Sequence, residues 1–193
     1  MRVFILLLTA FTVVALAAPL SYAGDAEVCF CREEVSITLD ADAIVFESLY
    51  CFENRGADAC NQKMHYEFSV DSVHLFPDTI SVAYGFMDLE YETTEKGITF
   101  SVGMPGQSCA SIRVDYSQTC LEPSFCYTPK TIAGWNEPIE EADFEIRVPA
   151  ELELTWVSYT MHEVSEEDEI EVHRFTCKDC LPSEDFCLKW DSK

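Results

Sequence analysis

The most regular pattern along the chain is an alternation of apolar and polar residues. It is clearest in residues 80–86, where Ile80, Val82, Tyr84 and Phe86 alternate with small or polar neighbours. A period of two places successive side chains on opposite faces of a β-strand. The same period recurs in residues 35–39, 66–70, 98–102, 112–116, 144–148, 152–156 and 170–172. The pattern predicts an all-β protein of about eight to ten strands.

Turn residues separate these segments. The sequence Thr94-Glu95-Lys96-Gly97 is typical of a hairpin loop in which the glycine takes a positive φ. Met104-Pro105-Gly106 predicts a tight turn, in which proline fixes φ and glycine adopts the left-handed conformation. Many short strands with one apolar face each favour an antiparallel β-sandwich, because two such faces can pack together. A closed barrel is the less favoured alternative.

Residues 42–52 fit two structures. Their apolar residues, Ile44 and Leu49 among them, could form one face of a helix capped by Asp42. The same residues also fit a buried strand, since β-branched and aromatic side chains are frequent in strands. We favour the strand and keep the helix as the alternative.

The first residues have the organisation of a secretory signal peptide. A positive charge precedes an apolar run over residues 3–18, and small residues follow up to Ala23. We expect cleavage after Ala23, which would make residues 1–23 a leader and residues 24–193 a single extracellular domain. The alternative, a membrane anchor, is disfavoured because the run is short for a transmembrane helix. We therefore expect a secreted protein with no transmembrane segment.

Ten cysteines follow this leader. An even number of cysteines in an exported chain predicts a framework of about five disulfides. The candidates are Cys29, Cys31, Cys51, Cys60, Cys109, Cys120, Cys126, Cys177, Cys180 and Cys187. Their connectivity stays open, because ten cysteines allow hundreds of pairings.

The spacing of the cysteines suggests some local features. Cys29 and Cys31 are too close along a strand to bond easily, so each is expected to reach a different partner. Cys51 and Cys60 could close a local loop. The C-x-x-C pair in residues 176–193 would indicate zinc or thiol exchange inside a cell, but a structural disulfide fits an oxidising compartment better. We interpret residues 176–193 as a short cysteine-rich tail packed on the domain.

The chain is strongly acidic, with a formal net charge of −23. Such a charge disfavours nucleic acid and anionic membranes as partners and favours cations, basic proteins or a cationic matrix surface. The acids concentrate in one region, and alternation would place several of them on one polar face. This candidate cation-binding face comprises Asp143, Glu145, Glu151, Glu153, Glu166, Glu167, Asp168, Glu169 and Glu171. A Ca²⁺ site, diffuse attraction of a basic partner and a merely solvated face all remain open.

Recognisable catalytic chemistry is missing from the sequence. It contains no nucleophile elbow, P-loop, dinucleotide-binding glycine motif or H-E-x-x-H metal motif. The four histidines are separated along the chain, and paired carboxylates cannot be selected among so many acids. We therefore predict a non-enzymatic protein without catalytic residues and without a cofactor.

A resemblance to a known family suggests one further function. Residues 148–156, followed by a loop, a strand and Cys177, are similar to the end of an MD-2-related lipid-recognition domain. That family contains secreted, disulfide-bonded β-sandwiches that hold lipids between their sheets, so the resemblance implies a lipid carrier. The closely spaced cysteines at both ends of the domain depart from this family.

Together these observations predict a secreted binding protein with an acidic face that engages a basic protein, a matrix or another cationic partner. A lipid carrier and an extracellular Ca²⁺-binding module are the alternatives. The sequence contains no N-x-Ser/Thr sequon, so N-glycosylation is not expected.

Overall fold

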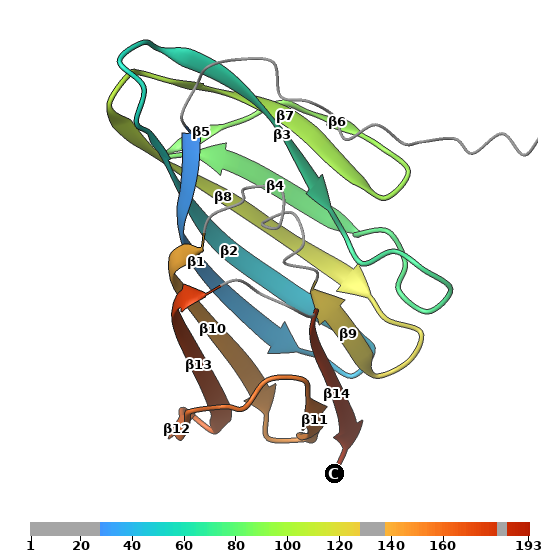
Figure 1. Cartoon of the computed structure of the whole chain (residues 1–193). Helices are drawn as coiled ribbons and strands as arrows, with labels where there is room; N and C mark the ends of the chain where they lie inside the picture. Colours follow the sequence, from blue (N-terminus) through green and yellow to red (C-terminus); the bar gives the residue numbers. More distant parts are fainter. Residues whose placement is uncertain (1–27, 128–137, 181–184) are drawn as a thin grey trace, which may run out of the picture.

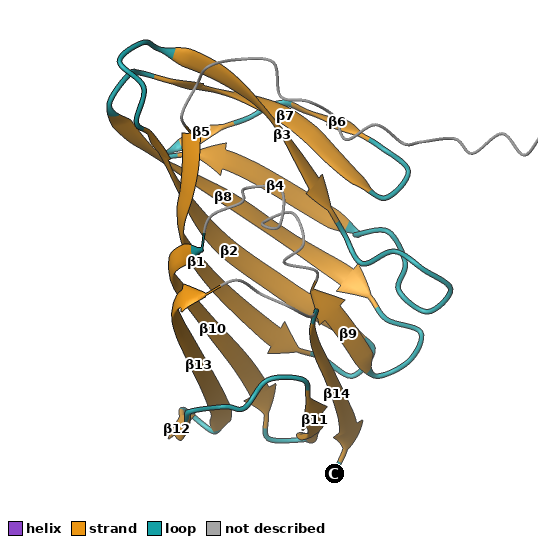
Figure 2. Ribbon diagram, in the orientation of Figure 1, coloured by secondary structure: helices purple, strands orange, loops and turns teal. Residues whose placement is uncertain are grey.

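The computed structural model describes residues 28–127, 138–180 and 185–193, and all the elements of this part of the chain are β-strands (Figure 2). The predicted leader and its cleavage site after Ala23 lie outside the described residues. The all-β prediction is confirmed, and the sheets remain open rather than closing into a barrel.

The largest element is a sheet of eight strands in the order β12-β13-β10-β1-β2-β8-β4-β5 (Figure 1). Its strands are β1 (Val28–Leu39), β2 (Ala43–Asn54), β4 (Thr79–Tyr84), β5 (Met87–Asp88), β8 (Ser108–Thr119), β10 (Ile139–Pro149), β12 (Glu163–Glu167) and β13 (Ile170–Cys180). Neighbouring strands are antiparallel except β1 and β10, which run parallel. The expected sandwich thus contains one parallel pairing, between strands that are far apart in the sequence.

Two sheets of three strands pack on one face of the large sheet. One has the order β11-β14-β9 and the other β3-β7-β6. Their strands are β3 (Cys60–Glu67), β6 (Tyr91–Thr93), β7 (Gly97–Met104), β9 (Ser124–Tyr127), β11 (Leu152–Val157) and β14 (Phe186–Ser192). Tyr50 of β2 is close to both small sheets, with hydroxyl-to-hydroxyl distances of 3.1 Å to Tyr66 and 3.2 Å to Tyr127. The two small sheets therefore cover the same face of the large one.

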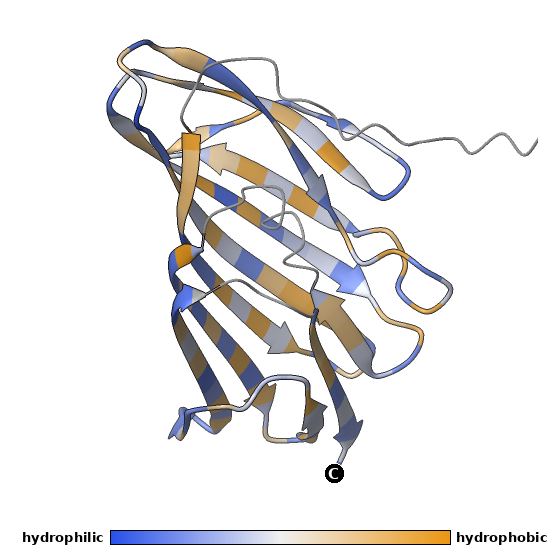
Figure 3. Ribbon diagram, viewed as in Figure 1, coloured by the Kyte–Doolittle hydropathy of each residue, from blue (hydrophilic) through white to orange (hydrophobic). Residues whose placement is uncertain are grey.

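The core between these layers follows from the period-two pattern. Along β2 and β10 alternate residues are buried, and Figure 3 shows the resulting bands of hydrophilic and hydrophobic residues on the strands. Phe46 of β2 stacks on Tyr116 of β8 with ring centroids 4.7 Å apart, and Phe144 stacks on Phe186 of β14 at the same distance. Trp190, also on β14, is 1% exposed. Burial of such large aromatic side chains is the main stabilising contribution to the packing of the layers.

The segments with a period of two all contribute to strands, and residues 43–54 form β2, which confirms the choice of strand over helix for this region. One inference from the alternation is wrong. Phe86 was expected on the apolar face that contains Val82, but it lies in the turn between β4 and β5 and is fully exposed. The strand ends at Tyr84 because Gly85 adopts a positive φ of 61° and reverses the chain.

Both predicted glycine turns are present, but for a different physical reason than expected. Neither Gly97 nor Gly106 has a positive φ; the left-handed residue after Gly106 is Gln107, with φ of 53°. A Cβ atom on Gly97 would lie 2.0 Å from the carbonyl oxygen of Tyr66, and one on Gly106 would lie 2.0 Å from that of Ala57. These glycines are needed because another backbone segment passes too closely for a side chain.

The cysteine-rich tail is part of the sheets rather than an appendage on them. Residues 176–180 complete β13, and residues 186–192 form the central strand of a small sheet. Cys187 on this strand forms a disulfide with Cys126 of β9, directly opposite in the strand register. The tail is therefore fixed to the domain by strand pairing as well as by a covalent bond.

The structure accounts for one of the five disulfides expected from the cysteine count. Free thiols are present at Cys31, Cys51, Cys60, Cys109, Cys120 and Cys177. The suggested Cys51–Cys60 bridge is not formed, because the Cys51 sulfur faces Ser111 of β8 while Cys60 opens β3 opposite Met104. The expected disulfides that would use these six cysteines are therefore not formed in the structure.

We expect the double substitution Cys126→Ala and Cys187→Ala to lower the free energy of unfolding by about 4 kcal/mol, because the bond closes a loop of 61 residues in the unfolded chain. Urea denaturation followed by circular dichroism measures this. Thr93→Ala, an exposed change on β6 of the other small sheet, is the control. An equal midpoint for the double variant and the native chain would contradict the expected contribution of this disulfide.

Candidate functional site

The candidate functional site is a groove of about 550 Å³ on the face of the large sheet that is turned away from the small sheets. Strands β1, β2, β8, β10 and β13 supply its walls. Each contributes the polar half of its alternating pattern, because the apolar half faces the core. The charged lining residues are the carboxylates of Glu34, Glu47, Asp115, Asp143 and Glu145 and the guanidinium groups of Arg32, Arg113 and Arg174.

The floor of this groove contains an interruption in the pairing of β2 with β8. Phe46 pairs with Tyr116 and Leu49 with Arg113, but the two residues between them on β2 form no ladder pair with β8. Side chains replace the missing bonds: the Ser48 amide donates to the Asp115 carboxylate at 3.2 Å, and the Ser48 hydroxyl donates to the Val114 carbonyl at 2.6 Å. Asp115 thus has a structural role in addition to its charge.

Arginines neutralise part of the negative charge at the β10 and β13 side of the groove. Arg174 lies 2.9 Å from Glu145 and 2.6 Å from Glu167, and it also donates to the Ser165 hydroxyl at 2.9 Å. The Arg174 guanidinium lowers the pKa of Glu167 below its usual value. Arg32 contacts Asp143 at 3.3 Å in the same way. These acids are therefore already paired and are poor candidates for holding a free cation.

The negative charge without a close counter-ion lies in the middle of the groove. Glu47 forms no ion pair with a described residue, and Arg113 approaches Asp115 only to 3.9 Å. The pKa of Asp115 is raised, first because it is partly buried and, to a lesser extent, because Glu47 is nearby. At this centre, formed by Glu47 and Asp115, an added positive charge could pair without breaking a shorter ion pair.

The structure separates the acids that the sequence grouped as a single face. On the groove side, Glu145 and Glu167 pair with Arg174, and Asp143 contacts Arg32 and Thr176. Glu166 and Glu171 are opposite each other on β12 and β13. Glu171 is an odd number of residues from Arg174 along β13, so both acids point to the other face of the sheet. Asp168 and Glu169 form the turn between these strands with positive φ angles, Glu151 lies in the turn after β10, and Glu153 lies on β11 of a small sheet.

The candidate cation face therefore does not form one continuous surface. Among the described residues no group of three or more histidine, cysteine or acidic side chains is arranged to hold a metal ion. The Ca²⁺ site remains a prediction from the acid content alone.

A second polar cluster lies inside the protein and was not found from the sequence. Glu33 of β1 is fully buried, its carboxylate accepts a hydrogen bond from the Tyr127 hydroxyl, and its second oxygen has no partner among the described residues. Burial raises the pKa of Glu33 to about 7, while the bond from Tyr127 opposes the shift. The Tyr50 and Tyr66 hydroxyls extend the chain of contacts from Tyr127.

The sequence contained a signal for this cluster. Arg32, Glu33 and Glu34 are consecutive charged residues within β1, and in a strand with one buried face at least one of three consecutive side chains must point inward. Tyr50 lies opposite Glu33 in the β1–β2 register and also points inward. The arginines that pair with the groove acids had no comparable signal, because they come from strands distant in the sequence.

Comparison with known proteins identifies the fold and no family. No family model matches the chain, and no curated protein sequence matches it. A candidate nutrient-binding protein from Legionella pneumophila has a similar structure, with a TM-score of 0.69 and 11% identity over 86% of this chain and 67% of that protein. An M1 zinc metallopeptidase from Deinococcus radiodurans bound to a Tyr-Ser-Ala substrate has a TM-score of 0.54 and 10% identity over 84% of this chain and 42% of the enzyme.

These likenesses show that the arrangement of sheets occurs in solved proteins, and the chain spans less than half of the metallopeptidase. No helix in the described part of the chain is long and apolar enough to cross a membrane.

We expect Asp115→Ala to lower the free energy of unfolding by about 1–2 kcal/mol, because the Ser48 amide at the interrupted ladder would lose its acceptor. Asp115→Asn is the matched control, since its side-chain carbonyl can still accept from this amide. Chemical denaturation of both variants makes the comparison. Equal loss of stability in the two would show that the charge of Asp115, rather than its hydrogen bond, supports the strand.

Proposed function

We propose that this protein is a secreted, non-enzymatic binding protein that uses the groove on the large sheet to hold a basic polypeptide segment of a partner. The observation that carries the proposal is the negative centre at Glu47 and Asp115. Glu47 has no ion pair with a described residue, and Asp115 has a long one, 3.9 Å from Arg113, in a groove with five carboxylates and three arginines. A lysine or arginine side chain of a ligand would find a carboxylate there without displacing an existing short ion pair.

The shape of the site supports an extended ligand. The groove crosses five strands, and its lining contains both acids and arginines, so a chain with mixed charges could make several complementary contacts. The net charge of −23 adds a long-range attraction that would raise the rate of encounter with a basic partner. The candidate nutrient-binding protein of similar fold agrees with a binding function.

Lipid carriage between the sheets has less support. The layers are in contact through aromatic side chains, such as Phe46 and Tyr127 with ring centroids 5.2 Å apart. The groove lies on the opposite, charged face, where an acyl chain would gain little. The lipid and Ca²⁺ alternatives therefore rest on the sequence alone.

A short oligolysine peptide tests the proposal by isothermal titration calorimetry. We expect binding that weakens at least tenfold between about 50 mM and about 500 mM salt, because exposed charge pairs are screened. We also expect the double substitution Glu47→Gln and Asp115→Asn to weaken binding about three- to tenfold at low salt.

The matched control is the double substitution Glu90→Gln and Glu92→Gln, which removes the same charge from an exposed region around β6. If both double variants lose affinity equally, the peptide is attracted by the overall charge and the groove is not its binding site. If the first double variant binds like the native chain, the proposed site is wrong.

A further inference from the structure

Strand β9 is held by contacts at both of its ends. It spans only Ser124–Tyr127 and is the edge strand of its small sheet, joined to β14 by strand pairing and by the Cys126–Cys187 disulfide. Because of that bond, β9 and β14 can move away from the large sheet only together. The contacts at the two ends of β9 therefore help to hold the whole small sheet against the large sheet.

The contact at the C-terminal end of β9 is the buried carboxyl of Glu33. The Tyr127 hydroxyl donates to this carboxyl. The Tyr50 hydroxyl lies 3.2 Å from that of Tyr127, and the Tyr66 hydroxyl lies 3.1 Å from that of Tyr50. Each phenol has a single proton, so an ionised Glu33 requires all three hydroxyls to point toward it. No arginine, lysine or histidine of the described residues bonds to Glu33, so its charge has no counter-ion in the core.

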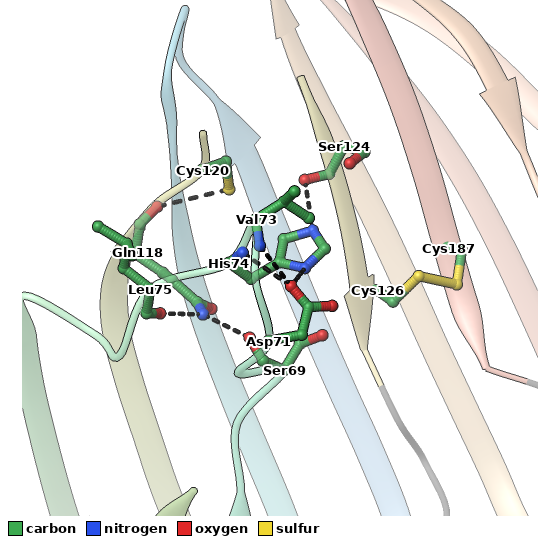
Figure 4. Close-up of polar contacts among 10 residues, drawn as sticks. All are labelled: Ser69, Asp71, Val73, His74, Leu75, Gln118, Cys120, Ser124, Cys126 and Cys187. Carbon is green, nitrogen blue, oxygen red and sulfur yellow. Dashed lines mark hydrogen bonds and ion pairs between the residues drawn. A yellow bond between two sulfur atoms is a disulfide. The ribbon is translucent and has the colours of Figure 1, made fainter. Parts of the chain in front are cut away.

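The contact at the N-terminal end of β9 is the imidazole of His74 (Figure 4). This residue is 5% exposed and lies in the loop between β3 and β4. Its Nε2 atom is 3.0 Å from the backbone carbonyl of Ser124, and its Nδ1 atom is 2.9 Å from the Asp71 carboxylate. Gln118 of β8 fixes the same loop through bonds to the carbonyls of Ser69 and Leu75.

The partners of His74 fix the orientation of its ring. A carbonyl oxygen can only accept a hydrogen bond, so Nε2 donates to Ser124. The pKa of Asp71 is lowered to about 2, mainly by the Val73 amide, and this carboxylate is the partner of Nδ1.

Acidic side chains lie near the bridge between His74 and Cys120. Cys120 forms a backbone bridge with His74, and Asp42, Asp71 and Asp78 all lie near Cys120. The ring of Phe125, with its centroid 6.5 Å from that of His74, covers another side.

We propose that the small sheet β11-β14-β9 is docked on the large sheet over the buried Glu33 carboxyl, and that this docking weakens as the pH rises. Deprotonation of Glu33 places a charge without a counter-ion in the core. The bond from Tyr127 offsets only part of this cost, because no other described residue donates a hydrogen bond to Glu33. Movement of β9 away from the large sheet would let water reach the carboxylate.

The direction for Glu33 follows from linkage. Its carboxyl has a higher pKa in the folded than in the unfolded chain, so the folded state binds more protons. The stabilising effect is complete below about pH 4.5 and is lost as the pH rises through about 7. The protein would therefore loosen at this sheet in the range that separates acidic compartments from neutral surroundings.

Hydrogen exchange of the intact protein, followed by mass spectrometry at about pH 5.5 and about pH 8 and corrected for intrinsic exchange, tests this. We expect amides of β9 and β14 to exchange at least tenfold faster at the higher pH, with little change in β10 and β13. Glu33→Gln should reduce this difference, because it removes the titrating group. Glu92→Gln, an exposed change on β6, is the control and should leave the difference intact.

Equal corrected exchange at the two pH values would overturn the proposal, as would a loosening shared equally by β10 and β13. Retention of the full difference in Glu33→Gln would show that this carboxyl takes no part. If Glu33→Gln does not fold, Tyr127→Phe replaces it: without its only hydrogen-bond donor, Glu33 should titrate at a higher pH, and the loosening should shift upward with it. An unshifted transition would again contradict the proposal.

Discussion

The structure depends on covering one apolar face of a long, eight-stranded sheet. Period-two patterning gives every strand one apolar and one polar side, so the sheet must bury the first and can expose the second. The chain achieves this with two separate small sheets rather than one large partner, and these meet the central aromatic residues of β2 and β8. The uncovered face remains charged, and it forms the groove because no layer is needed there.

Burial of a carboxylate in the core of such a protein is unusual. Glu33 has Tyr127 as its single hydrogen-bond donor and no counter-ion among the described residues, although a hydrophobic residue at this position would pack without any desolvation cost. The cost is reduced only when the carboxyl is neutral. The packing of the layers around Glu33 therefore depends on the pH. A requirement for stability alone does not explain a glutamate at this position.

Much of the fold could be predicted from local patterns, because strand formation depends on residues close in sequence. Residues 80–84 and 144–148 were identified from alternation alone. The parallel pairing of β1 with β10 could not be, since their registered residues, Val35 and Phe144 for example, are more than a hundred positions apart. The ends of strands were also uncertain: Phe86 continues the apolar pattern but follows a glycine that turns the chain.

The candidate site could be predicted from the sequence even less well than the fold, because its ion pairs join strands that are distant in the sequence. The acids Asp143 and Glu145 were recognised from their alternation. In the folded chain Arg32 of β1 lies beside Asp143 and Arg174 of β13 beside Glu145, so both carboxylates already have an ion pair. Conversely Glu47 and Asp115 drew no attention in the sequence. They lie where the β2–β8 ladder opens, and the only ion pair between them and a described residue is the long one of Asp115 with Arg113. Charge in a sequence is a count, whereas binding depends on which charges lack a partner after folding. A net charge of −23 therefore does not by itself locate the place where one more positive group would be favoured, and the centre of the groove at Glu47 and Asp115 is the place that we propose.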